Sequence, residues 1–410
     1  MIDIHSLIRP NILKLKPYSS ARDEFEGKAN VWLDANENPF DNGLNRYPDP
    51  HQKDLKWAMA REKNLNPDQV FFGNGSDEVI DLLMRAFCIP GKDKILQCSP
   101  TYGMYRVSAE TNDVEVLDVP LMQDFQIDLA AAKKVIADEL PKLIFLCSPN
   151  NPTGNLMDQK AIESLLASNA IVVIDEAYSD FSSQPSWTKR LSEFNNLFVM
   201  QTFSKARGLA SIRLGIGFGN PEIISVLDKI KPPYNVNGPT QEAALRSLVT
   251  FDGKVVSELI EERRRLEIEL PKIDGVLKIY PSEANFLLAE FDDASAAYEL
   301  LAKNGVVVRD RSRQIANCLR ITVGTPQENQ KLLALLNGEN LPESTDRIGK
   351  VRRTTNETDI SIEVNLDDNS KTSISTGIGF YDHMLDQVSK HGKIGLRIQV
   401  QGDLEIDEHH

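Results

Sequence analysis

Short and almost uninterrupted apolar runs alternate with amphipathic stretches between about residue 31 and residue 220. Polar residues do not alternate with apolar ones inside these runs, which is typical of parallel strands covered on both faces. Between two of them, Asp158–Ala167 places Ile162, Leu165 and Leu166 on one side of a predicted helix. This alternation predicts an α/β sheet. The predicted strands are Leu143–Cys147, Ile171–Ile174, Leu197–Met200 and Ile212–Phe218.

The following hundred residues have a different order of elements. A charged helix is predicted at Glu258–Leu270. After it come predicted strands at Asn285–Ala289 and Leu319–Val323 and predicted helices at Ala294–Lys303 and Pro326–Leu336. This mixture predicts a second, smaller α+β domain.

The pattern changes again after the last of these helices. Asn337–Gly349 is polar, lacks hydrophobic periodicity and is predicted to be a linker. Beyond it, strands are predicted at Ile360–Leu366, Thr372–Ser375 and Leu396–Val400, and four of the six histidines lie between residues 383 and 410. We therefore expect a large domain over 31–265, a small domain over 1–30 plus 266–336, the linker over 337–349, and a separate module over 350–410.

Composition and charge limit the classes of function. Of 410 residues, 41% are hydrophobic and 26% are charged, as in ordinary globular proteins. Asp and Glu number 60 against 46 Lys and Arg, a net charge of −14, which argues against a protein dedicated to nucleic acids, because such proteins neutralise phosphates. No apolar run approaches the roughly 20 residues that cross a bilayer, and no secretory signal is evident. With no CxxC pair among four cysteines, we expect the reducing cytoplasm.

Three short motifs carry candidate chemistry. They are SPNNPTG at Ser148–Gly154, DEAY at Asp175–Tyr178, and Ser204-Lys205 followed by Arg213. A lysine after a buried strand can form a Schiff base when burial or neighbouring cations lower its pKa. An aspartate at the carboxyl end of a strand can keep a pyridine nitrogen protonated, which an electron sink for a carbanion requires.

A fourth segment, GNGSDE at Gly73–Glu78, opens a predicted amphipathic helix whose first N–H groups could bind a phosphate, with Arg213 adding a charge-assisted bond. Each feature has an ordinary structural explanation when taken alone. Asp175 and Ser76 could be helix N-caps, SPNNPTG could be a simple turn, and Lys205 could be a solvated lysine. Their joint order and spacing favour one shared site.

Together these motifs resemble the pyridoxal-phosphate aminotransferases of fold type I, and more closely the histidinol-phosphate aminotransferases. The resemblance implies a large, mostly parallel α/β/α domain that binds the cofactor and a smaller α+β domain. It also implies transamination of L-histidinol phosphate with 2-oxoglutarate, giving imidazole acetol phosphate and glutamate, in histidine biosynthesis. The closer resemblance rests on LDANENP (33–39), LNRYPDP (44–50), PTYGMY (100–105), GVVVRD (305–310) and CLRITVGT (318–325).

The same resemblance implies roles for individual residues. Lys205 would hold the cofactor as a Schiff base and shuttle a proton to and from the substrate carbon, and Asp175 would pair with the pyridinium nitrogen. Asn151 and Tyr178 would bond the ring oxygen, and Tyr102 would stack on the ring. Tyr47 would reach the cofactor phosphate from the other subunit of a homodimer. The other residues implied at that phosphate are Gly75, Ser76, Asp77, Ser204 and Arg213.

The substrates call for fixed positive charge. Histidinol phosphate presents a phosphate and glutamate presents two carboxylates, and the planar fork of arginine suits both groups. We predict that Arg309 and Arg320 bind these groups and that Tyr18 and Asn38 line the pocket. Arg309 could instead form a surface salt bridge, whereas Arg320 lies in an apolar strand, where an unpaired charge is costly.

The histidine-rich tail resembles a different family. RTTNET (353–358), TGIGFYDHMLDQVSKHG (376–392) and GDLEIDEHH (402–410) are similar to the first part of imidazoleglycerol-phosphate dehydratase, a manganese enzyme. The resemblance implies that His383, His409 and His410 are metal ligands and that Glu357 and His391 contact substrate. Because a metal site needs its full set of ligands, we expect an incomplete α+β fragment without dehydratase activity. A fragment that does not fold and the start of a purification tag are the alternatives.

Two other classes of function are compatible with part of the pattern. An aromatic or aspartate aminotransferase, or a decarboxylase of a phosphorylated amino acid, would share the motifs of the fold. A ligand-binding sensor without catalysis is disfavoured, because no GxGxxG stands between a strand and a helix and no basic DNA-binding segment is attached.

Overall fold

The structure is a computed structural model that describes residues 2–17, 25, 27, 29–339, 347–355, 357–370 and 372–402. The chain divides into two compact units, Met1–Asn337 and Gly338–His410. Each unit is described by itself.

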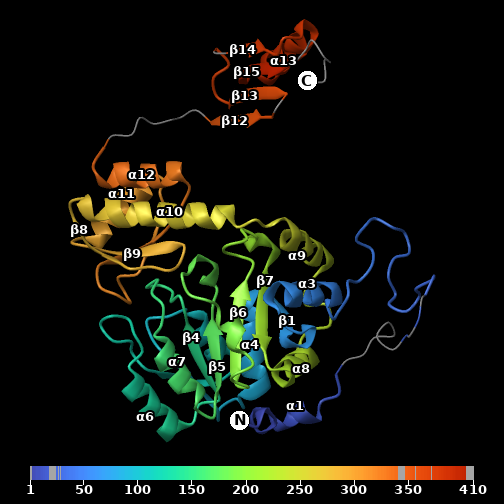
Figure 1. The fold of residues 1–410 in the computed structure, drawn as a ribbon, viewed down its shortest axis with the longest axis vertical. Coiled ribbons are helices and arrows are strands. Elements are labelled where there is room, and N and C mark those ends of the chain that lie inside the picture. The colour runs from blue at the N-terminus through green and yellow to red at the C-terminus, as the bar shows by residue number, and fades with distance from the viewer. Residues whose placement is uncertain are drawn as a thin grey trace. The chain divides into compact units, whose positions relative to one another are not determined.

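A seven-stranded sheet forms the centre of the first unit, in the order β1-β7-β6-β5-β4-β2-β3 (Figure 1). The strands β2 to β6 are parallel to their neighbours among themselves, and β7 runs antiparallel to both β6 and β1. This is the expected mostly parallel α/β sheet. The bounds are β1 Val70–Asn74, β2 Lys94–Gln97, β3 Glu115–Asp118, β4 Leu143–Cys147, β5 Ile171–Asp175, β6 Leu197–Thr202 and β7 Leu214–Gly219.

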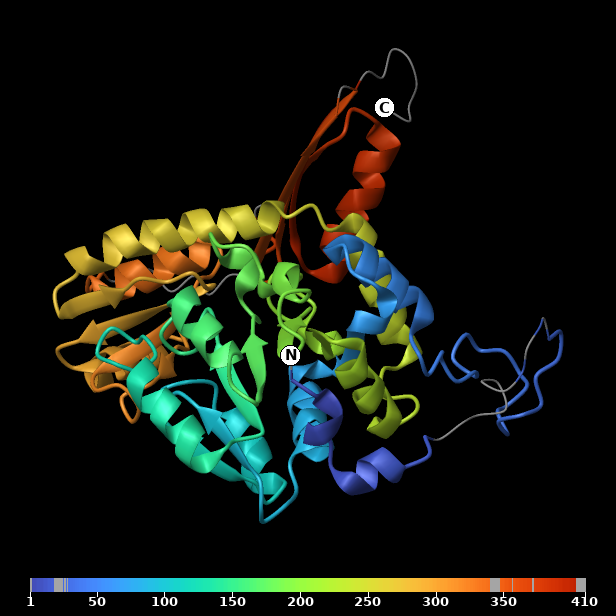
Figure 2. The same cartoon turned by 60° about the horizontal axis from the view of Figure 1, so that its bottom comes forward.

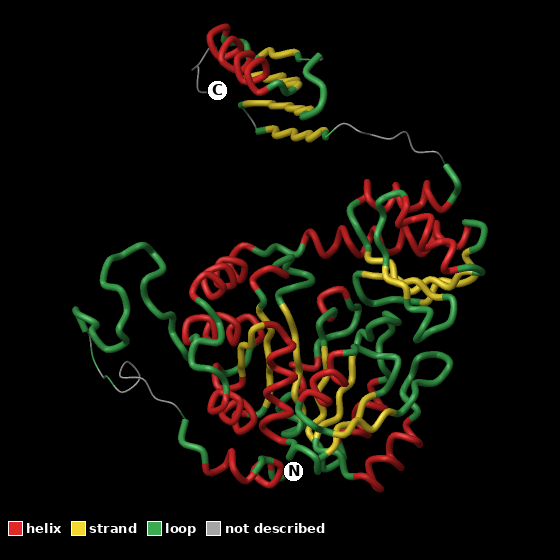
Figure 3. Tube along the Cα trace, turned by 180° about the vertical axis from the view of Figure 1, so that it is seen from behind, coloured by secondary structure: helices red, strands yellow, loops and turns green. Residues whose placement is uncertain are grey.

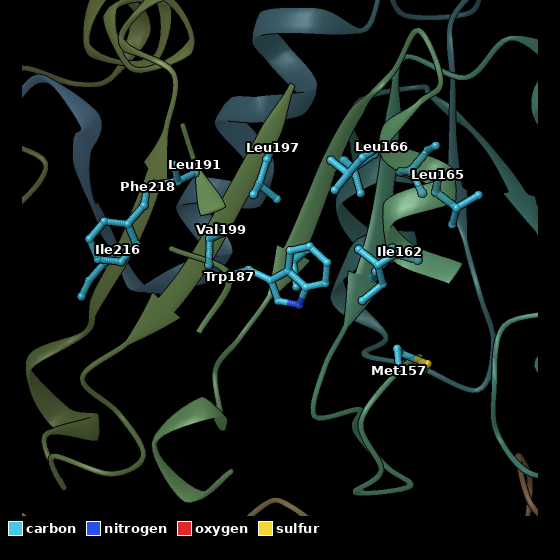
Figure 4. Packing of buried hydrophobic residues seen from close by; sticks show 14 of the residues in the cluster. Met157, Ile162, Leu165, Leu166, Trp187, Leu191, Leu197, Val199, Ile216 and Phe218 are labelled. Carbon is cyan, nitrogen blue, oxygen red and sulfur yellow. The ribbon is translucent and has the colours of Figure 1, made fainter. Parts of the chain in front are cut away.

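The central strands are apolar throughout because their alternate residues enter two different cores. In β5, Val172 and Ile174 belong to one hydrophobic cluster and Ile171 and Val173 to another. Figure 4 shows the first cluster, where side chains of β6 and β7 meet Trp187 and residues of the helix that follows β4. A strand with this pattern needs helices on both of its faces.

Helices cover both faces of the sheet (Figure 3). The first cluster includes residues of α3, α6, α7 and α9, and the second includes residues of α4, α5 and α8. None of the helices in the described ranges combines the length and apolar character that crossing a membrane requires. The bounds are α3 Lys53–Lys63, α4 Gly75–Phe87, α5 Met104–Thr111, α6 Leu129–Glu139, α7 Gln159–Leu166, α8 Pro221–Ile230 and α9 Gly238–Thr250.

The strand predicted at Ile212–Phe218 differs from the prediction in two ways. Its first residue belongs to a 3-10 turn, η5 (Ala210–Ile212), and Arg213 has a left-handed backbone with φ +54°. The strand β7 therefore starts only at Leu214, and it is antiparallel rather than parallel. An apolar run records burial on both faces but not strand direction, so the sequence pattern could not distinguish the two.

The N-terminal segment packs on the large domain. It contains η1 (Ile4–Leu7) and α1 (Pro10–Lys14), and Ile4, Leu7 and Ile8 are buried in the cluster that also holds α4 and α8. The expected assignment of residues 1–30 to the small domain does not match the contacts of residues 4–8. Ile4, Leu7 and Ile8 are covered by helices of the large sheet instead, whereas Leu13 and Leu15 are exposed.

The small domain of the first unit is an antiparallel sheet covered by helices. Its strand order is β10-β11-β9-β8, and α10, the long yellow helix in Figures 1 and 2, packs against α12 and β9. The structure confirms the predicted helices at Ala294–Lys303 and Pro326–Leu336. The bounds are α10 Lys254–Glu269, η6 Leu270–Lys272, β8 Val276–Tyr280, β9 Phe286–Phe291, α11 Ala294–Lys303, β10 Arg309–Asp310, β11 Cys318–Thr322 and α12 Pro326–Leu336.

A small apolar cluster joins the two domains beside the candidate lysine. It includes Tyr178 and Ala206 of the large domain, and Val256, Ala284 and Phe286 from α10 onwards. Nearby are the short 3-10 segments η3 (Ser179–Phe181) and η4 (Trp187–Arg190). The segment after β5 and the segment after β6 are thus held against the small domain.

The second unit is a four-stranded sheet with one helix. Its order is β12-β13-β15-β14, with β14 and β15 parallel and the other pairs antiparallel, and α13 (Gly379–Gly392) packs against β14 and β15. The predicted linker at 337–349 overlaps β12, because Ile348 and Gly349 already pair with β13. The bounds are β12 Ile348–Thr354, β13 Thr358–Asn365, β14 Ser373–Ser375 and β15 Gly395–Gly402.

Candidate active site

A cavity of about 150 Å³ lies where β4, β5 and β6 end. Cys147, Asp175 and Thr202, the last residues of these strands, all line it. The carboxyl ends of parallel strands are the usual place for a ligand in an α/β sheet. Nine of the residues predicted for the site also line this cavity: Ser76, Asp77, Tyr102, Asn151, Asp175, Tyr178, Ser204, Lys205 and Arg213.

Lys205 lies in the turn that follows β6, with its amino nitrogen 5.6 Å from the centre of the Tyr178 ring. Desolvation by the surrounding protein lowers the pKa of Lys205 below the ordinary value, and Arg320 and Arg213 lower it further, while Asp175 acts in the opposite direction. A lowered pKa increases the fraction of neutral amine, which is the nucleophilic and basic form.

Asp175 is the last residue of β5 and is 3% exposed. Its Oδ1 accepts the N–H of Ala177 at 3.1 Å, and its Oδ2 accepts the hydroxyl of Tyr105 at 2.6 Å. Burial raises the pKa of Asp175, and these two hydrogen bonds and Lys205 oppose that effect. The carboxylate is therefore held by two donors while it remains on the cavity wall.

At the start of α4 the cavity has a recess lined by Ser76, Asp77, Ser204 and Arg213. Gly75 has φ +73°, its N–H donates to the carbonyl of Arg213 at 2.8 Å, and a side chain placed on it would come within 2.7 Å of the Arg213 guanidinium. The guanidinium lies 3.5 Å from the Asp77 carboxylate, whose other oxygen accepts the Tyr102 hydroxyl at 3.0 Å. Helix N–H groups, the Ser204 hydroxyl and a guanidinium are the donors that bind phosphate.

Asn151 connects the cavity to the small domain. It lies in the SPNNPTG turn after β4 and is 5% exposed, and its Oδ1 accepts Nη1 of Arg320 at 2.5 Å. Arg320 comes from β11, and its guanidinium also lies 5.2 Å from the ring of Phe286. The Nε of Arg320 is buried without a hydrogen-bond partner among the described residues.

Three arginines gather on the hairpin that carries Arg320. Arg309 stands directly opposite Arg320 in the β10–β11 ladder, and the ladder continues through the N–H of Arg311, which donates to the carbonyl of Cys318 at 2.9 Å. Like charges opposite one another destabilise a sheet, and in the described part of the chain none of the three forms a salt bridge. The Nε of Arg311 is also buried without a partner there. Arg311 was not predicted from the sequence, because only the hairpin register places it beside Arg320.

Two other predicted residues, Asn38 and Tyr47, do not line the cavity. Tyr18 lies outside the described residues. Asn38 is in an exposed loop, where its Oδ1 accepts the N–H of Phe40 at 3.0 Å, and Tyr47 stacks on Tyr234 at 4.5 Å between ring centres. Within the chain the described part of this loop makes few apolar contacts, because Leu33 and Phe40 are 88% and 80% exposed.

The residues singled out in the tail are only partly described. His383 and His391 lie on α13, with His391 3.2 Å from Gln387, and Glu357 lies between β12 and β13. His409 and His410 lie outside the described residues. Over the described ranges, the side chains form no group of three or more His, Cys, Asp or Glu residues suited to a metal ion.

The comparison with known proteins covers both parts of the chain. Residues 21–336 match the aminotransferase class I and II family, and residues 376–410 match imidazoleglycerol-phosphate dehydratase. A histidinol-phosphate aminotransferase of Christiangramia forsetii is 52% identical over 338 residues, which are 81% of this chain and 96% of that protein.

Solved structures give the same result. The histidinol-phosphate aminotransferase of Clostridium acetobutylicum has a TM-score of 0.67 and 26% identity, over 72% of this chain and 90% of that one. The enzyme of Sinorhizobium meliloti in complex with pyridoxal-5'-phosphate has a TM-score of 0.66 and 25% identity, over 72% of this chain and 82% of that one. With its fold, its cavity and these relatives, the chain belongs to the class I and II aminotransferases, among the histidinol-phosphate aminotransferases.

Proposed function

We propose that this chain transfers the amino group of L-histidinol phosphate to 2-oxoglutarate, with pyridoxal phosphate as cofactor, yielding imidazole acetol phosphate and glutamate. The observation that carries the proposal is the single cavity lined by Lys205, Asp175 and the recess at the start of α4. The recess fits a phosphate, Asp175 fits a protonated ring nitrogen, and the amine of Lys205 faces the same space. Two relatives that match this chain over 96% and 98% of their own length are named histidinol-phosphate aminotransferase.

When bound, the cofactor supplies an electron sink for the carbanion that forms when the substrate loses its Cα proton. Lys205 is the base that removes this proton and the acid that returns it, for which its lowered pKa suits it. Asp175 would hold the proton on the ring nitrogen by its negative charge. Asn151 and Tyr178 would bond the ring oxygen, Tyr102 would cover the ring, and Gly75, Ser76, Asp77, Ser204 and Arg213 would surround the phosphate.

The arginine hairpin is proposed to select the anionic substrates. The Nε atoms of Arg311 and Arg320 are buried without a hydrogen-bond partner among the described residues, and Arg309 stands opposite Arg320, so a phosphate or carboxylate would satisfy these unused donors. This observation favours a phosphorylated or dicarboxylic substrate over an aromatic amino acid.

The test is an assay of the purified chain with three amines and 2-oxoglutarate: histidinol phosphate, histidinol and phenylalanine. We expect kcat/KM for histidinol phosphate to exceed that for the other two amines by about tenfold to a hundredfold. One or two charge-assisted hydrogen bonds to the phosphate would account for this ratio. Lys205→Ala should abolish turnover, and Lys189→Ala, a change of an exposed lysine in η4, should not. Equal rates with histidinol would contradict the substrate assignment. Release of CO₂ from a phosphorylated amino acid would favour the decarboxylase alternative.

We further propose that the chain acts as a homodimer in the cytoplasm. The exposed apolar residues of the loop over 31–47 would then be covered by the second subunit, and Tyr47 would reach the cofactor phosphate there. The four cysteines are all buried and unpaired, as suits a reducing compartment.

For the tail we propose no dehydratase activity in this chain. The candidate ligand His383 and the candidate substrate contact His391 both lie on α13, and a manganese site needs carboxylate or further imidazole ligands around the same point. Turnover of imidazoleglycerol phosphate with Mn²⁺ present, and none without it, would contradict this proposal.

A further inference from the structure

Tyr105 donates a short hydrogen bond to the carboxylate of Asp175, yet it does not line the cavity. Its hydroxyl donates to Oδ2 of Asp175 at 2.6 Å, across 70 residues of sequence. The other oxygen, Oδ1, accepts the N–H of Ala177 at 3.1 Å. Tyr105 thus binds one carboxylate oxygen of Asp175 without being exposed to the cavity itself.

The phenol of Tyr105 has little freedom to move away. Tyr105 is fully buried at 0% exposure on α5. Its ring stacks on Phe145 of β4 at 4.9 Å and 20°, and it meets the edge of Tyr102 at 5.6 Å and 83°. One rigid side chain therefore contacts both Asp175 and the tyrosine proposed to cover the cofactor ring.

The hydrogen bond acts on the charge of Asp175. Burial raises the pKa of Asp175, and the bond from Tyr105 is the largest effect that opposes it. Burial and the nearby carboxylate also raise the pKa of Tyr105, which favours the protonated phenol that donates to Asp175. A carboxylate in this position without the donor would be costly to keep ionised.

We propose that Tyr105 is a positioning residue whose hydroxyl fixes the Asp175 carboxylate and keeps it ionised, ready to pair with the ring nitrogen of the cofactor. The inference rests on the proposed function only in taking pyridoxal phosphate as the cofactor. It assigns no contact between Tyr105 and any substrate. The other titratable groups that act on Asp175 or Tyr105 are Asp77, Tyr102, Cys147, Tyr178 and Lys205.

The experiment measures how the affinity of the cofactor-free chain for pyridoxal phosphate depends on pH. Affinity is lost as the pH falls and Asp175 takes up a proton. In Tyr105→Phe the carboxylate loses a donor, so we expect the midpoint of this loss to move up by about one pH unit, a tenfold change in proton affinity. Tyr280→Phe removes a similar hydroxyl, 2.9 Å from Glu290 in the small domain, and should leave the midpoint unchanged.

A double substitution tests whether Tyr105 acts through Asp175. In the Asp175→Asn background, adding Tyr105→Phe should change cofactor affinity by less than twofold, because no carboxylate remains to be held. If Tyr105→Phe does not fold, 3-fluorotyrosine at position 105 keeps the shape and strengthens the donor, and the midpoint should then move down.

The inference is overturned if the midpoint stays at the wild-type value in Tyr105→Phe or with fluorotyrosine, or if Tyr105→Phe has its full effect in the Asp175→Asn background. Failure of the proposed substrate is a separate result, because cofactor binding is measured without substrate. A wild-type chain that binds no pyridoxal phosphate would overturn both.

Discussion

Burial acts in opposite directions on the two ionisable residues that define the cavity. It lowers the pKa of Lys205 and raises that of Asp175, since it disfavours the charged form of each. The neighbouring groups then affect the two pKa values differently. Arg320 reinforces the effect on Lys205, whereas the donors on Asp175 oppose burial and favour the carboxylate. The amine of Lys205 and the carboxyl group of Asp175 thus share one small space in which their neighbours act on them differently.

The first prediction concerns Arg320 and the amine of Lys205. The amine attacks an aldehyde only when it is deprotonated, so the rate at which the cofactor-free chain binds pyridoxal phosphate rises as the pH rises through the pKa of Lys205. Arg320→Ala removes a cation that lowers this pKa, and the midpoint should move to higher pH. Stopped-flow absorbance between pH 6 and about 10 measures it. Arg313→Ala, an exposed neighbour on the hairpin, is the control, and a midpoint that stays or falls in Arg320→Ala would be evidence against the effect.

The second prediction concerns Arg311. Removing its guanidinium in Arg311→Ala takes a donor from the hairpin that is proposed to bind the substrate anion, so kcat/KM for histidinol phosphate should fall about tenfold to a hundredfold, mainly through KM. Steady-state kinetics with Arg313→Ala as the matched control measure the loss. If kcat/KM falls equally in both variants, the loss comes from the lower overall positive charge and not from a contact of Arg311 with the substrate.

At the scale of elements, the recess depends on the close approach of β7 to the start of α4. A side chain on Gly215 would come within 2.3 Å of the backbone of Gly75 and Ser76. This position is where the sheet touches the turn that is proposed to bind the cofactor phosphate, and only glycine leaves room for it.

The third prediction follows from this contact. Gly215→Ala should push α4 away from β7, lowering cofactor affinity at least tenfold and the free energy of unfolding by about 1–3 kcal/mol, as overpacking does. Ultrafiltration binding and urea unfolding measure the two. Gly238→Ala, whose new methyl group would meet only Pro48 at 3.9 Å, should change neither quantity much. An unchanged cofactor affinity in Gly215→Ala would show that the recess is not the phosphate site.

The sequence predicted elements best where the signal is local. The bounds of α11 and α12 follow from caps that the sequence displays, Asp293 and Thr325, whose side chains accept N–H groups of the first turn. The direction of β7 and the presence of β12, a strand that was not predicted, depend on pairing with other strands. Neither is recorded in the apolar pattern of one segment.

The same distinction applies to the site. Lys205, Asp175 and Asn151 stand in short motifs, so local sequence was enough to predict the one cavity that all three line. Tyr105 stands in the same PTYGMY segment as Tyr102, but its contact with Asp175 joins α5 to β5 and appears only in the folded chain. Arg311 likewise needed the register of β10 and β11.

At the scale of the whole chain, the exposed apolar side chains of the loop over 31–47 are unusual. Leu33 and Phe40 are almost fully exposed, and an exposed group of large apolar residues commonly marks an interface. The loop also carries Tyr47, so its placement against a second subunit would complete the proposed site.

The fourth prediction tests this arrangement. The wild-type chain should sediment as a dimer, and Leu33→Asp should shift it towards monomer and lower cofactor affinity, because a buried charge opposes association. Leu140→Asp, a change of a similarly exposed residue after α6, is the control and should remain dimeric. Analytical ultracentrifugation and cofactor titration measure both variants. A wild-type monomer with full cofactor affinity would refute the role of Tyr47.

The most direct measurement is to find the lysine to which the cofactor attaches. The chain is incubated with pyridoxal phosphate, reduced with borohydride and digested, and the labelled peptide is identified by mass spectrometry. We expect the label on Lys205 in the wild-type chain and none at any site in Lys205→Ala, which keeps its fold. A label on another lysine, with Lys205 unmodified, would contradict the placement of the active site in this cavity.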